Sequence, residues 1–143
     1  MAYNVGVLIS GSGSNLKAII DSGINVKFVV SNKYDAGGLS IAKKANIPVY
    51  SWKSLSQLES EVCKLILKYN TGLLILAGFM RLLSSNFIQS VPKQSIINIH
   101  PSLLPAFKGA NAIEQALKYG VKYTGVTIHY VNEGMDSGLI IDQ

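Results

Sequence analysis

Several features of secreted, membrane-spanning and disordered proteins are rare or absent in this sequence. It has a single cysteine, Cys63, among 143 residues, so no intrachain disulfide can form and nothing points to an oxidising compartment. The longest apolar run, residues 73–80, is far shorter than the roughly 20 residues that cross a bilayer. The N-terminal residues lack the basic segment of a signal peptide. We therefore expect a cytoplasmic protein.

Acidic residues are scarce as well, with eight against thirteen basic ones, and the formal net charge is +5. A basic balance favours an anionic partner, either a polynucleotide or a small phosphate or carboxylate. Because the basic residues stand singly or in pairs, without an arginine-rich run, we expect a small-molecule ligand and neither nucleic acid nor a membrane. Apolar residues make up 48% of the chain, which excludes disorder and predicts a single domain over residues 1–143.

Apolar runs alternate with helical patterns along the chain. Strands are expected at residues 4–9, 26–30, 47–50, 73–77, 96–99 and 124–131. Helices are expected between them: Ser54 and Gln57 form a capping box for one, and Asn111 and Glu114 cap the last, which ends at Gly120. This alternation predicts an α/β fold, a doubly wound, mostly parallel sheet with helices on both faces. Ligands of such sheets bind beyond the C-terminal ends of the strands.

The first predicted strand is followed by a turn rich in glycine and serine. Two glycines allow the backbone to approach a ligand closely, and the free N–H groups at a helix start favour an anion. The turn is either a phosphate cradle or a tight turn with Ser or Asn as the helix cap; its residues are Gly11, Ser12, Gly13, Ser14 and Asn15. Leu16 replaces the third glycine of a dinucleotide fingerprint, and the lysine of a P-loop is absent. A monophosphate therefore fits the turn better than NAD or ATP.

Polar side chains also follow the later strands. Asn98 and His100 share one face of a strand, and Pro101 keeps His100 out of helical geometry. An imidazole carries a proton near neutral pH and a carboxamide can donate to an oxyanion, so the pair is either catalytic or satisfies loop backbone. Asp136 either stabilises a turn or lies beside His100, where it favours the imidazolium. His129 lines the same cleft or, the interpretation we favour, bonds neighbouring backbone; no metal-ligand spacing is present.

Four segments carry a resemblance to a known family. They read VLISGSGSNLKAII, LAGFMRLLS, NIHPSLLPAFKG and GVTIHYVNEGMDSG, and the match covers nearly the whole chain. The sequence resembles the phosphoribosylglycinamide formyltransferases (glycinamide ribonucleotide transformylases), folate-dependent formyltransferases with a Rossmann-like fold. The resemblance implies transfer of a formyl group from 10-formyltetrahydrofolate, the donor co-substrate, to the amine of glycinamide ribonucleotide in de novo purine biosynthesis, without a metal.

The resemblance also implies roles for individual residues. Asn98, His100 and Asp136 correspond to the catalytic trio, in which Asn98 and protonated His100 stabilise the oxyanion and Asp136 helps to relay protons. The turn of residues 11–15 corresponds to the site for the ribonucleotide phosphate, and Pro101 lies against the same substrate. The residues implied in folate binding are Met80, Arg81, Leu82, Leu83, Asn98, Asn132, Glu133, Gly134, Met135 and Asp136.

The sequence departs from the family pattern in three places. Leu55 stands where family members commonly have a basic residue that contacts folate, with Lys53 nearby. Ala110-Asn111-Ala112 replaces a Leu-His-Thr segment, so a family histidine near the site is missing. The family continues beyond the position of Gln143 with a strand and a long helix. We therefore expect a domain truncated at its C-terminus, with an exposed apolar edge or face that pairs or aggregates.

Three other functions remain open beside the transferase. Two of them, a formyltetrahydrofolate deformylase-type hydrolase and methionyl-tRNA formyltransferase, use a similar trio, but the serine-rich turn favours the ribonucleotide enzyme. The third is a truncated domain that binds folate or nucleotide without turnover. A monomer or a homodimer is expected.

Overall fold

The computed structural model describes residues 3–143 and divides the chain into two compact units, Met1–Leu83 and Ser84–Gln143. Strands and helices alternate in the first unit: β1 (Val5–Ile9), α1 (Ser14–Asp21), β2 (Val26–Ser31), α2 (Gly37–Lys44), β3 (Val49–Ser51), α3 (Leu55–Lys68) and β4 (Leu73–Leu76). The second unit contains α4 (Ser85–Ser90), β5 (Ile96–His100), α5 (Ala112–Tyr119), β6 (Thr127–Tyr130) and β7 (Ile140–Asp142). That the chain acts as a single domain stays a prediction.

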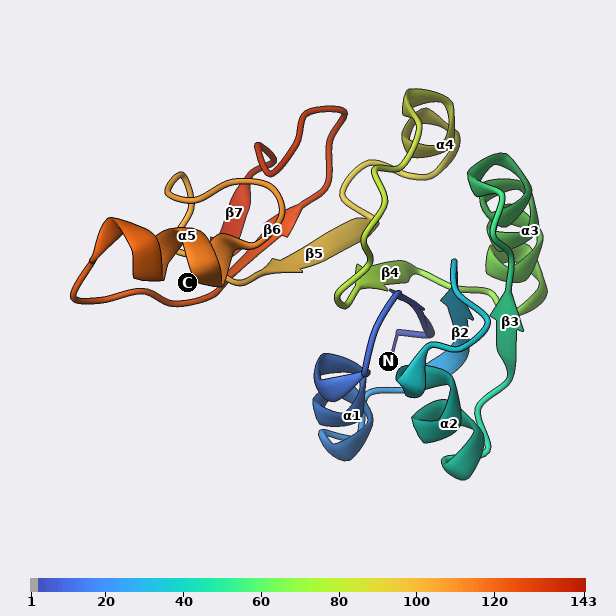
Figure 1. The fold of residues 1–143 in the computed structure, drawn as a ribbon. Helices are drawn as coiled ribbons and strands as arrows, with labels where there is room; N and C mark the ends of the chain where they lie inside the picture. Colours follow the sequence, from blue (N-terminus) through green and yellow to red (C-terminus); the bar gives the residue numbers. More distant parts are fainter. Residues whose placement is uncertain (1–2) are drawn as a thin grey trace. The chain divides into compact units, whose positions relative to one another are not determined.

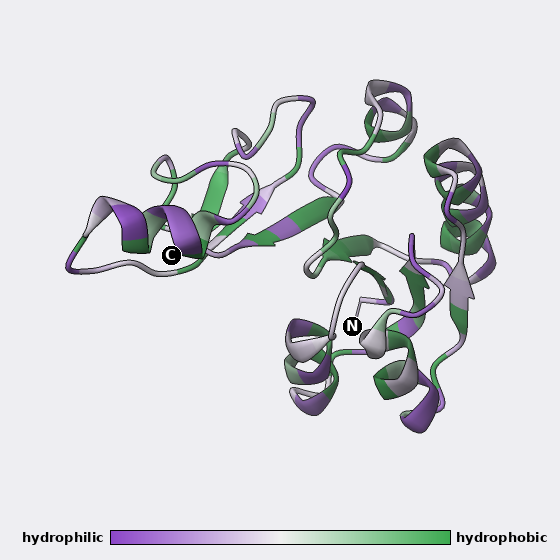
Figure 2. Ribbon diagram, in the orientation of Figure 1, coloured by the Kyte–Doolittle hydropathy of each residue, from purple (hydrophilic) through white to green (hydrophobic). Residues whose placement is uncertain are grey.

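The first unit is a parallel sheet with the strand order β3-β2-β1-β4. β1 lies between two neighbours, and its Val7 pairs with Val29 of β2 and with Ile75 of β4. Helices α1 and α2 cover one face of these strands and α3 covers the other (Figure 1). Parallel strands covered on both faces are built from continuous apolar runs, which is the pattern of β1 and β4, while β2 interrupts its apolar run with Lys27 (Figure 2). The alternation of apolar runs and helical patterns predicts this unit correctly.

The core of the first unit consists of these strands and the inner faces of its helices. Every residue of β1 is buried, and Phe28 of β2 is fully enclosed. Along α3 the buried residues include Leu58 and Val62, on the face that the helical spacing predicts. The N-cap residue Ser54 accepts a hydrogen bond from Gln57 N at 3.4 Å, so the Ser54 half of the predicted capping box is present.

The second unit is built on an antiparallel ladder. β6 pairs with β5 on one side and with β7 on the other. The register places Asn98 of β5 opposite His129 of β6, and His100 opposite Thr127. This register brings three of the polar residues singled out in the sequence, Asn98, His100 and His129, onto neighbouring strands.

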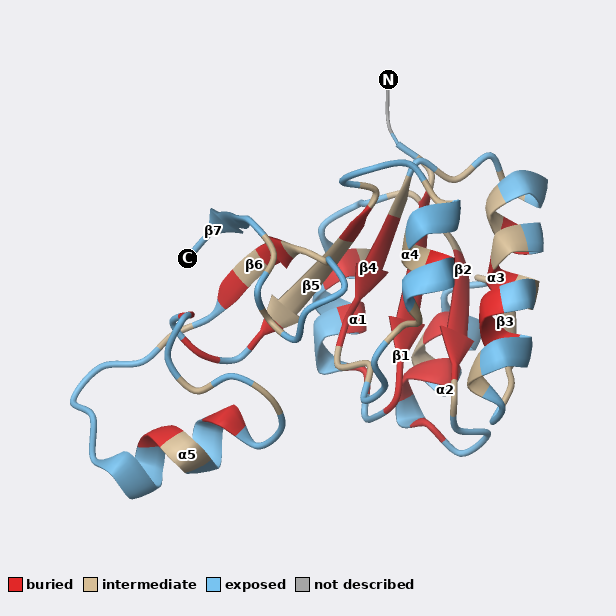
Figure 3. Cartoon of the chain, turned by 90° about the horizontal axis from the view of Figure 1, so that it is seen from above, coloured by how far each residue is buried: buried red, intermediate tan, exposed pale blue. Residues whose placement is uncertain are grey.

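Large apolar side chains of the second unit remain exposed. In Figure 3, α5 and β7 are drawn mostly in the colour of exposed residues. Leu117 and Tyr119 on α5 are 77% and 80% exposed, and Ile140 and Ile141 of β7 are nearly half exposed. The expected exposed apolar edge is therefore present, while pairing or aggregation through it stays a prediction. None of the helices described over residues 3–143 is both long and apolar enough to span a membrane.

Some elements differ from their predictions. The strand expected at 124–131 forms only over Thr127–Tyr130, and the one expected at 47–50 forms over Val49–Ser51. Helix α4 has no predicted counterpart, because six residues are too few to show a helical period. Asn111 is the N-cap residue of α5, as predicted, but its side chain makes no capping hydrogen bond. Its φ of 58° is left-handed, whereas side-chain capping uses an extended N-cap.

Candidate active site

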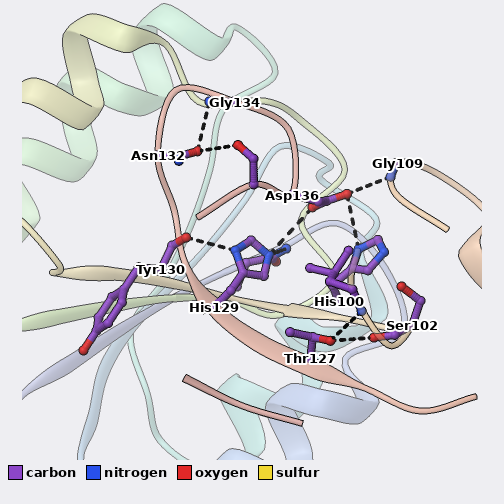
Figure 4. A network of polar contacts seen from close by, with 12 residues as sticks. His100, Ser102, Gly109, Thr127, His129, Tyr130, Asn132, Gly134 and Asp136 are labelled. Carbon is purple, nitrogen blue, oxygen red and sulfur yellow. Dashed lines mark hydrogen bonds and ion pairs between the residues drawn. The ribbon is translucent and has the colours of Figure 1, made fainter. Parts of the chain in front are cut away.

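Two neighbouring strands of the second unit present four polar side chains on one face. Asn98 and His100 lie two residues apart on β5, and Thr127 and His129 lie opposite them on β6. Side chains two residues apart share a face, and directly opposite residues have their Cβ atoms about 5 Å apart. The predicted side-by-side arrangement of Asn98 and His100 therefore has its counterpart on β6. Figure 4 shows His100, Thr127 and His129 of this group. His100, Thr127 and His129 are buried, so their polar atoms need partners inside the protein.

The loop that follows His100 is fastened to β6 by Thr127. Thr127 Oγ1 donates to the Ser102 carbonyl at 2.7 Å and accepts from Leu104 N at 3.0 Å. Thr127 and Ser102 are fully buried, so water does not compete for these bonds. A buried hydroxyl therefore holds the loop after His100 against β6.

Both ring nitrogens of His100 face oxygen atoms. Nε2 donates to the Phe107 carbonyl at 2.9 Å, and Nδ1 lies 3.5 Å from Oδ2 of Asp136. Carbonyl and carboxylate oxygens only accept, so a doubly protonated ring satisfies both contacts. The Nδ1 contact is longer than an ordinary hydrogen bond, and catalytic hydrogen bonds often tighten only when substrate binds. Nδ1 is therefore the ring nitrogen whose contact can change on ligand binding.

Asp136 lies between two imidazole rings (Figure 4). Its Oδ2 faces His100 and also accepts from Gly109 N at 2.7 Å, while Oδ1 lies 3.8 Å from Nε2 of His129. The side chain is only 12% exposed. The interpretation in which Asp136 lies beside His100 is confirmed. Its catalytic role stays a prediction.

His129 contacts both backbone and a site residue. Its Nδ1 lies 2.9 Å from the Tyr130 carbonyl, as the favoured interpretation predicts. Its Nε2 lies 3.2 Å from Nδ2 of Asn98. The favoured interpretation, a bond to neighbouring backbone, is therefore confirmed, and the ring also contacts Asn98. That His129 lines a ligand cleft stays a prediction.

A cavity of about 440 Å³ lies in the second unit beside these strands. Its apolar wall includes Ile88, Ile96 and Val131, and Asn132 and Glu133 contribute polar groups. The Glu133 carboxylate accepts from the Gln89 side chain at 2.6 Å. This volume and mixed lining fall in the usual range of small-molecule sites, roughly 300–1,000 Å³. Two of the residues implied in folate binding therefore line a cavity, while Gly134 and Met135 are exposed on the following loop.

In the first unit, the glycine-serine turn joins β1 to α1. Gly13 has a φ of 85°, and a Cβ there would lie 2.4 Å from Gly38 Cα, so only glycine fits. Gly13 is also the N-cap residue of α1 and offers no side-chain cap, so the interpretation with a Ser or Asn cap is wrong. The remaining residues of the turn, Gly11, Ser12, Ser14 and Asn15, are exposed. The phosphate cradle stays a prediction.

The segment of residues 80–83 follows β4 in the first unit. Ser10 Oγ accepts from Met80 N at 2.7 Å and donates to Asn32 Oδ1 at 2.5 Å. This buried hydroxyl fixes the start of the segment, whereas Met80, Arg81 and Leu82 are exposed. The backbone of the segment is thus held in place while its surface remains accessible to a ligand.

The positions that depart from the family pattern have different surroundings. Lys53 lies 5.3 Å from the centre of the Tyr34 ring, in a cation–π contact. Leu55 is the half-buried first residue of α3. Ala112 begins α5 and is buried.

Over residues 3–143, no three His, Cys, Asp or Glu side chains are grouped in a way that could hold a metal ion.

Two partners of the site residues were not identified from the sequence. The Phe107 carbonyl holds His100, and the Gly109 N–H holds Asp136. Both are backbone groups, which leave no residue-type signal. Thr127, which fastens the loop after His100, does have a sequence signal, because it alternates with His129 along an apolar strand.

Comparison with known proteins identifies related sequences and structures. The sequence model described as formyl transferase matches residues 3–143. The human trifunctional purine biosynthetic protein adenosine-3 is 44% identical over 150 residues, which span 97% of this chain and 15% of that protein. The phosphoribosylglycinamide formyltransferase of Haemophilus influenzae is 40% identical, with 97% of this chain and 70% of the relative covered.

A solved structure gives the same picture of the fold. The crystal structure of phosphoribosylglycinamide formyltransferase from Anaplasma phagocytophilum overlays with a TM-score of 0.91 at 42% identity, covering 99% of this chain and 70% of that one. The predicted α/β fold class with a mostly parallel sheet is confirmed by this overlay and by the strands described above. The chain belongs to the formyl transferase family.

Proposed function

We propose that this chain transfers a formyl group from 10-formyltetrahydrofolate to the amine of glycinamide ribonucleotide, as part of purine biosynthesis in the cytoplasm. The observation that carries the proposal is the grouping of Asn98, His100 and Asp136, with Nδ1 of His100 3.5 Å from the carboxylate. The names of the relatives support the same reaction, because proteins 40% and 44% identical are called phosphoribosylglycinamide formyltransferase and trifunctional purine biosynthetic protein.

The chemistry of such a transfer suits these three side chains. The amine nitrogen attacks the formyl carbon, and negative charge develops on the formyl oxygen. An N–H of Asn98 and the protonated ring of His100 donate to this oxygen. The bond from the formyl carbon to folate N10 then breaks; the amine loses one proton and N10 gains one. Asp136 carries this proton, because its carboxylate can exchange one with His100.

Residues outside the trio also have assigned roles in the proposal. The cavity lined by Asn132 and Glu133 suits the pterin of the folate, which has a flat ring with polar edges. The backbone and side chains of residues 80–83 contact the same co-substrate. The exposed turn of residues 11–15 holds the ribonucleotide phosphate, since it precedes a helix N-terminus and carries free donors. Pro101 lies against the ribonucleotide.

A domain that binds these ligands without turnover is the alternative function. It is favoured by the segment Ala110-Asn111-Ala112, which lacks a histidine that the family pattern places there. Binding and turnover therefore have to be measured separately on the same protein.

The test is an assay of formyl transfer by the purified chain, with both substrates present and both products quantified. Turnover is expected in the wild type, and Asp136→Asn and His100→Ala are each expected to lose on the order of 100-fold or more in kcat. The matched control is Leu67→Ala, at a side chain that is 83% exposed on α3. If either site variant keeps kcat within about threefold of the wild type, the assignment of the trio is wrong. Folate binding without any turnover would establish the alternative.

A further inference from the structure

His129 occupies a position whose hydrogen bonds reveal which ring nitrogen carries the proton. It lies on β6 directly opposite Asn98 of β5, and only 2% of its surface is exposed. Nδ1 lies 2.9 Å from the Tyr130 carbonyl. A carbonyl oxygen accepts and never donates, so Nδ1 must carry a hydrogen.

The other ring nitrogen then has a defined part in the neutral ring. With the hydrogen on Nδ1, Nε2 offers a lone pair and acts as an acceptor. The group that faces it is Nδ2 of Asn98, at 3.2 Å, which can only donate. The amide orientation of Asn98 and the tautomer of His129 therefore require each other.

The carboxylate of Asp136 is a charged neighbour of the His129 ring. Oδ1 of Asp136 lies 3.8 Å from Nε2, too far for a hydrogen bond, and Oδ2 of the same carboxylate faces His100. A hydrogen on Nε2 would point at Asp136 and would also face the N–H₂ group of Asn98, donor against donor. That arrangement would favour rotation of the amide, with its oxygen turned toward His129.

We propose that His129 is a positioning residue: as the Nδ1–H tautomer it fixes the orientation of the Asn98 carboxamide, with the amide nitrogen toward the ring. Asn98 Nδ2 carries two hydrogens, so one remains for a ligand after His129 has accepted the other. The consequence for catalysis rests on the proposed function, because it requires that this second hydrogen meet the formyl oxygen. His129 itself does not contact the reacting atoms.

The orientation can be tested without any reaction. Nitrogen NMR of the folded wild-type chain should show His129 protonated on Nδ1 and not on Nε2 at neutral pH. The side-chain amide signal of Asn98 should shift in His129→Ala. It should shift much less in Ile128→Val, whose altered side chain points to the opposite face of β6. A hydrogen on Nε2, or an Asn98 amide signal unmoved in His129→Ala, would overturn the proposal.

Kinetics then test whether the orientation matters. His129→Ala should lose about tenfold in kcat with KM for both substrates nearly unchanged, because about one hydrogen bond of orienting energy is lost. His129→Gln keeps an acceptor oxygen within reach of Asn98 and should retain kcat within about threefold. A purely structural role predicts that both variants lose activity in proportion to their lost thermal stability.

A double-mutant cycle separates action through Asn98 from any other effect. In an Asn98→Ala background, His129→Ala should cost less than about twofold more, since the group that it positions is already gone. A full tenfold loss in that background would overturn the proposal. If the wild-type chain shows no formyl transfer at all, the proposed function fails, while the NMR experiment still decides whether His129 orients Asn98.

Discussion

The two units of the molecule hold their candidate ligand-binding groups in different ways. In the unit Met1–Leu83, the candidate segments are backbone turns at the ends of buried parallel strands, and their own side chains are mostly exposed. In the unit Ser84–Gln143, the candidate groups are side chains held by hydrogen bonds within a small antiparallel ladder, beside many exposed apolar residues. Stability and ligand binding should therefore be separable in the first unit and coupled in the second.

The largest expected effect is on the core of the first unit. Phe28→Ala should lower the free energy of unfolding by about 3–5 kcal/mol, because a fully enclosed ring is replaced by a cavity. Under conditions in which the variant is still folded, kcat should match the wild type. Chemical denaturation and the formyl-transfer assay measure the two quantities, with the exposed Leu67→Ala as control. A folded variant with a large loss of kcat would contradict the separation.

Thr127→Val tests the coupling expected in the second unit. The change keeps the shape but removes the hydroxyl that bonds the Ser102 carbonyl and Leu104 N, so two buried backbone groups lose a partner. The expected loss of stability is about 1–3 kcal/mol, accompanied by a lower kcat, since the same loop holds His100. Thr124→Val, at an exposed position, is the matched control. A stability loss with unchanged kcat would show that the loop can shift without moving His100.

Gly11→Ala should change ligand binding in the first unit without changing its stability. A Cβ at Gly11 would meet no atom within 4 Å, so the melting temperature should not change. If the phosphate approaches this backbone, KM for the ribonucleotide should rise about tenfold while KM for the folate stays the same. An unchanged KM for the ribonucleotide would remove Gly11 from the proposed phosphate cradle.

The smallest expected effect concerns a pair of tyrosines in the first unit that have no assigned role in the reaction. The hydroxyl of Tyr69 lies 3.0 Å from that of Tyr50, and this hydrogen bond raises the pKa of Tyr50. A raised pKa in the folded state means that Tyr50 adds stability below the ordinary tyrosine pKa near 10. That stability is lost as the pH rises through the folded-state pKa.

Tyr69→Phe should therefore lower the pKa of Tyr50 and reduce stability below pH 10 by about 1 kcal/mol or less. The absorbance of tyrosinate during an alkaline titration measures the first quantity, and denaturation measures the second. The exposed Tyr123→Phe serves as control. An unchanged Tyr50 titration would show that the contact with Tyr69 does not hold the proton.

The sequence predicts those features that depend on local periodicity. Alternation along β5 correctly places Asn98 and His100 on one face, and the apolar runs correctly predict the parallel strands of the first unit. The contact of His129 with Asn98 depends instead on the register between β5 and β6, which the periodicity of one strand cannot set. The roles implied for the site residues remain to be tested by the variants above.

Other features escape sequence reasoning for conformational reasons. The side chain of Asn111 makes no capping hydrogen bond to α5, because the backbone at this N-cap is left-handed, and residue type alone does not reveal that. The partners of His100 and Asp136 are the backbone groups of Phe107 and Gly109, brought there by a loop whose path is set by buried contacts. The residue type gives information about a side chain, whereas these two residues contact the site through their backbone groups.

The close fit of Gly138 against β6 has a consequence for His129. A Cβ at position 138 would lie 1.6 Å from the Tyr130 carbonyl oxygen, so no side chain can be accommodated there. That oxygen is the one to which Nδ1 of His129 donates. Any substitution of Gly138 would have to displace this carbonyl and would break the hydrogen bond that fixes the His129 tautomer. Gly138 therefore helps to determine which nitrogen of the imidazole is protonated, and mutational scans should find this position as intolerant of substitution as the site residues themselves.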